Sequence, residues 1–280
     1  IYENAQFRVD LWEYDAASGE LSAKPMWPST RFTNNPEYSP DGSRVVFVSN
    51  REGEESLFVA TRDSVPAKLK LPEGFRYVNA HWSHDGRKLY SMRIGAAPPH
   101  AQSAVRIDVA TGATERLDAL GTEVSDIFPD RDGRYLYYST AAGPAMQLMR
   151  APLADLNRQE KLPLPLGSSF MIDATHVAIS QPQVRGLTLC TLAGFECEAL
   201  PLPISDSTVG AWAIGAGGIY YLDVAEPMSL ARYDLGERRV SWRSPYYPIP
   251  FGRTLAVAPD GAKLLLAREA PTLIDLMIVR

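Results

Sequence analysis

Four histidines are the first candidates for chemistry: His81, His84, His100 and His176. His81 and His84 are spaced like a metal-binding pair, but no second Cys or His pair lies at ligand spacing, so we expect no metal site. Both belong to a phrase that recurs along the chain, so we expect structural or surface roles for them. The four histidines are too scattered to suggest a cluster around one ion.

The acidic and hydroxyl side chains do not form a recognisable catalytic group. Residues 130–133, Asp-Arg-Asp-Gly, resemble the start of a calcium loop, but Ala141 stands where the bidentate Glu would be needed. No Gly-x-Ser-x-Gly elbow is present. We therefore expect no catalytic residue, no cofactor and no metal, and the chain by itself is predicted not to be an enzyme.

The two cysteines, Cys190 and Cys197, fall in one predicted hairpin. If Ala193-Gly194 is a two-residue turn, the cysteines face each other, and directly opposite Cβ atoms lie about 4.5–5.5 Å apart, near what a disulfide spans. The sequence predicts a cross-strand disulfide in an oxidising compartment such as the periplasm. The alternative is a pair of reduced cysteines in a cytosolic protein.

Composition limits the partners. The chain has 280 residues, 45% hydrophobic content and a net charge of −5, which suits one large domain over residues 1–280. No basic field is present to attract phosphates, so we expect no direct nucleic-acid contact. No apolar run is long enough for a membrane span or a signal-peptide core. We expect contact with a membrane only through a longer parent protein, from which this piece is processed or excised.

One recurring phrase sets the elements that would position any site. At residues 38–49, Tyr-Ser-Pro-Asp-Gly-Ser-Arg leads into Val-Val-Phe-Val-Ser, and related copies lie near residues 82, 128, 170, 213 and 257. The aligned turn positions, separated by 44, 47, 41, 43 and 44 residues, are Asp41, Asp85, Asp132, Asp173, Ala216 and Asp260. Asp-Gly favours a tight turn, and the apolar run after it predicts a strand buried on both faces.

A second strand pair lies between successive hairpins, as at residues 56–60 and 104–108. Four strands per repeat without a helical stretch predict an all-β fold, a β-propeller of four-stranded blades. Blades are expected to begin near residues 35, 78, 125, 168, 210 and 252. Residues 7–15 and 21–27 look like a further strand pair, and residues 273–279 like a third strand after the last hairpin. We therefore expect six to seven blades, with residues 1–30 forming a partial one.

The run at residues 38–51 resembles the WD40-like "PD40" repeat of TolB-type propellers, which also occurs in propeller domains of prolyl-oligopeptidase-like peptidases. The degenerate later blades, the cysteine hairpin and the ending at residues 274–280 also resemble the C-terminal propeller region of membrane-anchored winged-helix regulators of the CadC and ToxR type. That resemblance implies a non-catalytic, periplasmic sensory part of a transmembrane transcriptional regulator. A TolB-like periplasmic partner-binding protein, or the propeller of a hydrolase or lyase whose catalytic part lies elsewhere, stays open.

Aromatic side chains next to prolines outside the repeat phrase suggest a binding surface. Residues 244–251 link two blades, and tyrosines there would offer large contact area at low entropic cost. The alternative is that these rings pack on the neighbouring blade. The candidates for binding a protein or peptide partner, or a small ligand, at the rim or channel are Tyr246, Tyr247, Phe251, Trp27, Phe75, Tyr77 and His100.

Overall fold

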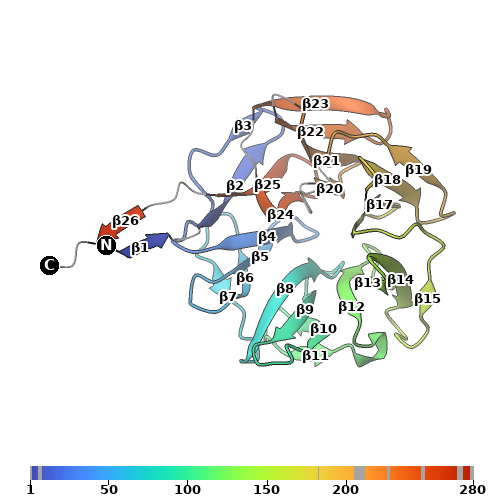
Figure 1. Ribbon diagram of the computed structural model, residues 1–280, viewed down its shortest axis with the longest axis horizontal. Helices are drawn as coiled ribbons and strands as arrows, with labels where there is room; N and C mark the ends of the chain where they lie inside the picture. The colour runs from blue at the N-terminus through green and yellow to red at the C-terminus, as the bar shows by residue number, and fades with distance from the viewer. Residues whose placement is uncertain are drawn as a thin grey trace.

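The computed structural model is a ring of six four-stranded antiparallel sheets around a central channel, a six-bladed β-propeller (Figure 1). The structure describes residues 2–5, 8–181, 183–204, 212–225, 228–246, 250–269 and 274–277. Across these ranges the one helical element is a single turn, η1 (Asp118–Leu120), and no helix is long and apolar enough to cross a membrane. The predicted all-β propeller fold is confirmed.

Each blade runs outward from the channel, and its first strand is the innermost (Figure 1). Blade 1 consists of β4 (Thr33–Tyr38), β5 (Val45–Ser49), β6 (Ser56–Ala60) and β7 (Ala67–Lys68). Blade 2 consists of β8 (Phe75–Trp82), β9 (Lys88–Gly95), β10 (Gln102–Asp108) and β11 (Thr114–Arg116). Blade 3 consists of β12 (Val124–Pro129), β13 (Tyr135–Ala142), β14 (Ala145–Pro152) and β15 (Glu160–Lys161). Blade 4 consists of β16 (Ser169–Ile172), β17 (His176–Ser180), β18 (Leu187–Thr191) and β19 (Cys197–Leu200). Blade 5 consists of β20 (Trp212–Gly215), β21 (Gly218–Asp223), β22 (Ser229–Asp234) and β23 (Arg239–Tyr246).

The recurring phrase forms the turn between the first and second strands of a blade. In blade 1, the carboxylate of Asp41 accepts hydrogen bonds from the Ser39 hydroxyl (2.5 Å) and the Ser43 backbone N–H (3.0 Å), and Gly42 has a φ of 72°. All five residues of β5, which follows this turn, are buried. The phrase therefore folds as its sequence predicts.

The glycine of the phrase also provides room for the preceding blade. A Cβ built on Gly133 in blade 3 would lie 2.6 Å from Nδ1 of His84, which belongs to the turn of blade 2. A Cβ on Gly86 in blade 2 would lie 2.9 Å from Nη2 of Arg44 in blade 1. The His84 ring therefore leaves no room for a side chain at residue 133, and the flexible Arg44 guanidinium would have to move to admit one at residue 86. Turns of neighbouring blades thus pack directly against each other.

The N-terminal strands close the ring. Blade 6 consists of β24 (Pro250–Val257), β25 (Lys263–Glu269), β2 (Val9–Asp15) and β3 (Glu20–Leu21), so its outer half comes from the other end of the chain. Strand β2 pairs with β25 from Val9↔Glu269 to Asp15↔Lys263. Lys263 forms an ion pair with Asp15, and the hydrogen bond from Lys263 is the main cause that holds the pKa of Asp15 below its usual range.

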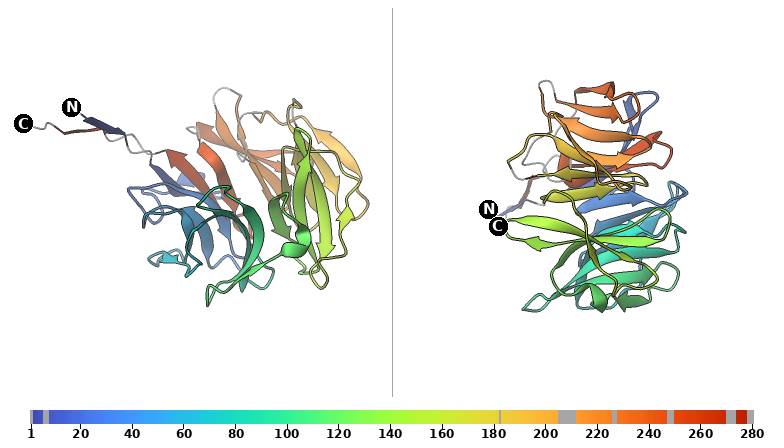
Figure 2. Two further views of the ribbon diagram at one scale, coloured as in Figure 1. Left: turned by 60° about the horizontal axis from the view of Figure 1, so that its bottom comes forward. Right: turned by 90° about the vertical axis from the view of Figure 1, so that its right-hand side faces the viewer.

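The expected seventh, partial blade at residues 1–30 is wrong. Strand β2 is the third strand of blade 6 and β3 is its fourth, so neither belongs to an additional sheet. The strand expected at residues 273–279 is β26 (Ile274–Met277), which pairs with β1 (Tyr2–Ala5) in a separate two-stranded ribbon. The ribbon extends away from the ring (Figure 2). Because β2 occupies the free edge of β25, β26 cannot be the third strand of blade 6.

A disulfide joins Cys190 and Cys197, as predicted, with the two Cα atoms 4.1 Å apart. The residues are directly opposite partners in β18 and β19, so the bond ties the outermost strand of blade 4 to its neighbour. The turn is longer than the predicted two residues. Phe195 adopts a left-handed φ of 56°, and its N–H donates to the Thr191 carbonyl at 3.0 Å. The register of the cysteines is unaffected.

Shortening Leu11 tests the closure. Its side chain in β2 is fully buried between blades 6 and 1, so we expect Leu11→Ala to lower the free energy of unfolding by about 3 kcal/mol. The control is Leu166→Ala. Leu166 is 41% exposed, so its replacement should lower the free energy of unfolding by less than about 0.5 kcal/mol. Urea denaturation measures both. Equal small losses would contradict closure by β2.

Removing the disulfide should have a modest effect, because it closes a short loop. We expect the Cys190→Ala/Cys197→Ala double variant to be about 2 kcal/mol less stable than the wild type in urea. A reductant should lower the stability of the wild type toward that of the double variant and leave the double variant unchanged. Free thiols in the freshly isolated native protein, detected by mass spectrometry, would contradict the bond.

Candidate functional site

A cavity of about 330 Å³ opens at the end of the channel where first strands turn into second strands. We call this cavity the channel mouth. All six blades contribute to its lining, through the ends of their first strands and the turns that follow. Two halves of the lining differ in chemistry: the polar lining side chains come from blades 1–3, and the described lining residues of blades 4–6 are all apolar.

The polar arc is shaped by irregularities in the innermost strands. Strand β4 shifts register between Asn34 and Glu37, and β8 shifts between Val78 and His81. Such bulges re-aim side chains. Asn35 and Asn79, at equivalent points of the two bulges, have left-handed φ values of 50° and 52°, which Asn tolerates better than most residues. The Asn35 amide donates to Asn79 Oδ1 at 3.1 Å, linking blade 1 to blade 2.

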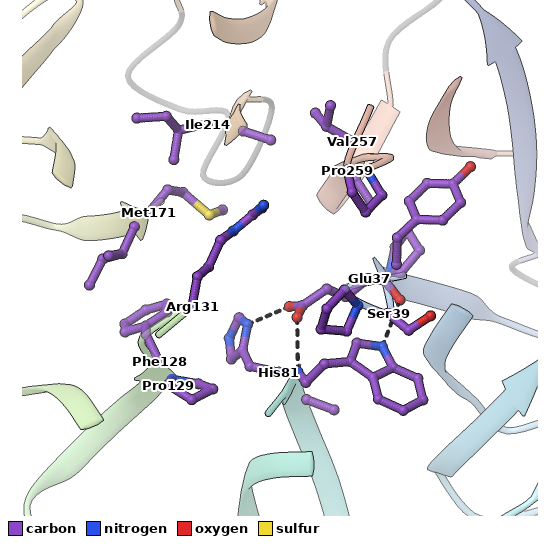
Figure 3. Close-up of a pocket in the computed structure, with 18 of the residues that line it drawn as sticks. Glu37, Ser39, His81, Phe128, Pro129, Arg131, Met171, Ile214, Val257 and Pro259 are labelled. Carbon is purple, nitrogen blue, oxygen red and sulfur yellow. Dashed lines mark hydrogen bonds and ion pairs between the residues drawn. The ribbon is translucent and has the colours of Figure 1, made fainter. Parts of the chain in front are cut away.

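Glu37, His81 and Asp126 form a charged group across blades 1, 2 and 3 (Figure 3 shows the first two). His81 Nδ1 lies 2.5 Å from Glu37 Oε2, and His81 Nε2 lies 3.6 Å from Asp126 Oδ1. The other oxygen of Glu37 accepts the backbone N–H of Trp82 at 2.9 Å. The His81 ring also rests on Phe128, with ring centroids 4.9 Å apart. The imidazole is thus held on several sides.

These neighbours decide the charge of His81. Burial by itself would lower its pKa, but the adjacent carboxylates of Glu37 and Asp126 outweigh burial and raise the pKa from 6.5 to about 9. His81 is therefore a cation at neutral pH, and it offsets one of the two carboxylate charges. In this state it is a positioned hydrogen-bond donor and has no lone pair with which to accept a proton.

The apolar arc faces this group across the channel. It is formed by Met171, Ile172, Ala213, Ile214, Leu255, Ala256, Val257 and Pro259. The Arg131 side chain extends from the turn of blade 3 between the two arcs (Figure 3). A Cβ built on Gly215 of blade 5 would lie 3.9 Å from Arg131 Nη2, which shows how far the guanidinium reaches. Arg131 makes no hydrogen bond or ion pair with any residue that the structure describes.

The described part of the chain holds no group of three or more His, Cys, Asp or Glu side chains suited to a metal ion. The calcium-like segment at residues 130–133 is the blade 3 turn. Asp130 accepts backbone N–H groups from Asp132 (2.6 Å) and Arg134 (3.3 Å) there.

Those of the singled-out aromatic residues whose side chains the structure describes lie away from the channel mouth. Trp27 stacks on Phe47 with centroids 5.3 Å apart and lines a second cavity of about 260 Å³ between blades 6 and 1. Tyr77 is 1% exposed in the core between blades 1 and 2, and Phe75 lies under the Arg93 guanidinium. His100 is exposed in the loop between β9 and β10, at the opposite end of β9 from the mouth. The side chains of Tyr246 and Phe251, and all of Tyr247, lie outside the described residues.

Sequence reasoning does not single out Glu37 or Arg131 as site residues, and it assigns His81 a structural or surface role. The signal was present, because Glu37 and His81 are 44 residues apart and occupy one position in successive repeats. That position is the next-to-last residue of an innermost strand, and its side chain lines the channel mouth. The same spacing also marks the turns, so by itself it predicts scaffold at the residues just before them.

The raised pKa of His81 makes stability depend on pH. The protonated ring stabilises the fold fully below pH 6.5, and this contribution is lost as pH rises through about 9. It amounts to about 3 kcal/mol. We expect the wild type to lose this stability between pH 6.5 and 9.5 relative to His81→Gln. NMR titration should place the His81 pKa near 9 and find it lower in Glu37→Gln. A midpoint at or below 6.5 would contradict the assignment.

Comparison with solved structures finds propellers at low identity. The chain is similar to TolB from Acinetobacter baumannii with a TM-score of 0.61 and 10% identity, over 94% of this chain and 64% of that one. The chain thus spans less than two thirds of that TolB. A structure from a nidogen/laminin complex gives a TM-score of 0.60 at 12% identity, covering 92% of this chain and 98% of the other. An oligogalacturonate lyase in complex with manganese gives a TM-score of 0.53 at 13% identity, covering 93% of this chain and 77% of the lyase.

No family model and no curated protein matches the sequence. The prediction that the chain is not an enzyme needs correction, because its fold is shared with the oligogalacturonate lyase and therefore does not separate binding proteins from enzymes. At these identities the likeness establishes the fold alone, and it is no evidence of catalysis here. The chain has a TolB-like six-bladed β-propeller fold.

Proposed function

We propose that this propeller recognises a small ligand or a segment of a partner protein in the channel mouth. One observation carries the proposal: the mouth joins a polar arc from blades 1–3 to an apolar arc from blades 4–6, and the Arg131 side chain extends between them. An apolar cavity with a few convergent polar groups is the usual form of a ligand site.

The size of the mouth suits a compact ligand. Ligand pockets span about 300–1,000 Å³, and about 330 Å³ lies at the lower end of this range. One or two residues of a peptide, or a molecule of similar size, would fill it. A protein partner would insert a chain segment here and contact the surrounding turns. Support for a protein partner comes from the similar structure determined in a nidogen/laminin complex.

The compartment and the parent protein belong to the same proposal. The Cys190–Cys197 disulfide supports an oxidising location such as the periplasm. With the resemblance of the repeat and cysteine hairpin, it supports a periplasmic sensory part of a membrane-anchored transcriptional regulator. The alternative is a TolB-like periplasmic binding protein. The full reading frame distinguishes them: a winged helix followed by about 20 apolar residues supports the regulator, and a secretory or lipoprotein signal alone supports the binding protein.

A fragment screen by ligand-observed NMR tests the site. The library should contain carboxylates, amines, sugars and apolar amides, so that no ligand class is assumed. We expect Met171→Glu to abolish or weaken the binding of most hits at least tenfold, because it places a charge in the apolar arc. The control is Val65→Glu, since Val65 is 88% exposed and is not one of the residues that line the mouth.

The screen contradicts the proposal if the hits bind Met171→Glu as well as they bind the wild type. Circular dichroism and thermal unfolding of both variants establish that the ring is intact. Hits that are instead lost on changing Trp27 would move the site to the cavity between blades 6 and 1.

A further inference from the structure

We propose that Arg131 is the anion-binding group of the channel mouth, and that the ligand carries a carboxylate next to an apolar group, as the C-terminal residue of a peptide does. This inference rests on the proposed function and adds the chemical class of the ligand. It depends on where Arg131 stands in its repeat, on what surrounds its guanidinium, and on the pairing of the other charges.

Arg131 occupies a repeat position whose other side chains rest on the next blade. The pairs Tyr38↔Val45 and Pro129↔Leu136 enclose turns of equal length, so Arg131 aligns with Pro40 of blade 1. By the same alignment it corresponds to His84 of blade 2, which covers Gly133 of blade 3. The Pro259 side chain of blade 6 likewise approaches Gly42 of blade 1.

Blade 4 offers Arg131 no such turn. Its first hairpin pairs Ile172 with Val177, so the turn is shorter than in blades 1–3, and its sequence, Asp-Ala-Thr-His, contains no glycine. The side chain of Arg131 therefore extends past this turn toward Gly215 of blade 5. The loss of the glycine accounts for a guanidinium inside the mouth.

The guanidinium lies beside apolar surface. Met171, Ile214 and Val257 surround the region into which it extends (Figure 3). An anion that binds there exchanges water for a planar donor group that matches a carboxylate in two hydrogen bonds. The nearby apolar wall lowers the local dielectric and strengthens that pair. The same wall would cover an apolar group attached to the carboxylate.

The other charges lining the mouth already have partners. Glu37 pairs with His81 and accepts the Trp82 N–H, and Asp130 accepts two N–H groups of its own turn. By contrast Arg134, three residues after Arg131, pairs with Asp132 at 2.8 Å. Among the lining side chains that the structure describes, Arg131 is the charged group left for a ligand.

The test compares an acid with its neutral amide. N-acetyl-L-leucine and N-acetyl-L-leucinamide differ in the carboxylate and share the apolar group. We expect calorimetry or NMR titration to show the acid binding the wild type about tenfold more tightly than the amide. Arg131→Gln should remove this preference. Arg134→Gln, a matched control in the same turn, should retain it, because Arg134 lies outside the mouth lining.

A second pair of probes separates the two sources of such a carboxylate. An acetylated hexapeptide ending in leucine is titrated as the free acid and as the C-terminal amide. Tighter binding of the peptide acid than of N-acetyl-L-leucine identifies a chain terminus as the ligand, and equal binding identifies a small carboxylate. Both outcomes support the inference if Arg131→Gln weakens the acid.

Three results would overturn the inference: equal binding of acid and amide, an unchanged preference in Arg131→Gln, or no binding of any of these probes to the wild type. The proposed function fails separately, through the fragment screen. If screen hits depend on Met171 while the carboxylate preference is absent, the mouth is a site for another ligand class. Arg131 is exposed, so its replacement should leave folding unchanged, which thermal unfolding checks.

Discussion

The pairing of β2 with β25 is the constraint on which the rest of the structure depends. It joins residues about 250 positions apart in the chain, from Val9↔Glu269 to Asp15↔Lys263, and completes the sixth blade. Leu11 then packs against blade 1, and Tyr14 packs against blade 5, where it stacks on Trp242 at 5.8 Å. The channel mouth takes residues from every blade, so it has its shape only when this closure holds all six innermost strands around one axis.

Within the closed ring, departures from the repeat produce the candidate site. The regular turns interlock through their glycines and are scaffold. The bulges at Asn35 and Asn79 aim Glu37 and His81 at the channel, where the Glu37 carboxylate helps to raise the pKa of His81. The short first turn of blade 4 contains no glycine against which the Arg131 side chain could pack, so this side chain extends into the mouth. One half of the ring thus supplies charge and the other half supplies apolar surface, an asymmetry that a perfect sixfold repeat could not provide.

Much of the fold could be predicted because short, local sequence patterns determine its hairpins. Asp-Gly turns followed by apolar runs predict hairpins, and the cysteine register follows from the hairpin even though its turn is longer than expected. The closure of the ring could not be predicted in the same way. Residues 7–15 have the pattern of a third strand, but no neighbouring residue indicates which strand they pair with. The sequence predicts only a structural or surface role for His81, because the carboxylates that surround it come from two other blades. The aromatic surface stays a prediction at Tyr246, Tyr247 and Phe251, whereas Trp27 and Tyr77 pack between blades.

We expect a carboxylate ligand to bind in the channel mouth, beside Met171. Two methionines distinguish the cavities, since Met171 lines the mouth and Met26 lines the cavity between blades 6 and 1. The most direct measurement is an NMR titration of protein labelled with ¹³C at the methionine methyl groups, using N-acetyl-L-leucine as the probe. We expect the Met171 signal to shift with saturation while the Met26 signal stays in place. A saturable shift of Met26 without one of Met171, or no shift of either, would contradict it.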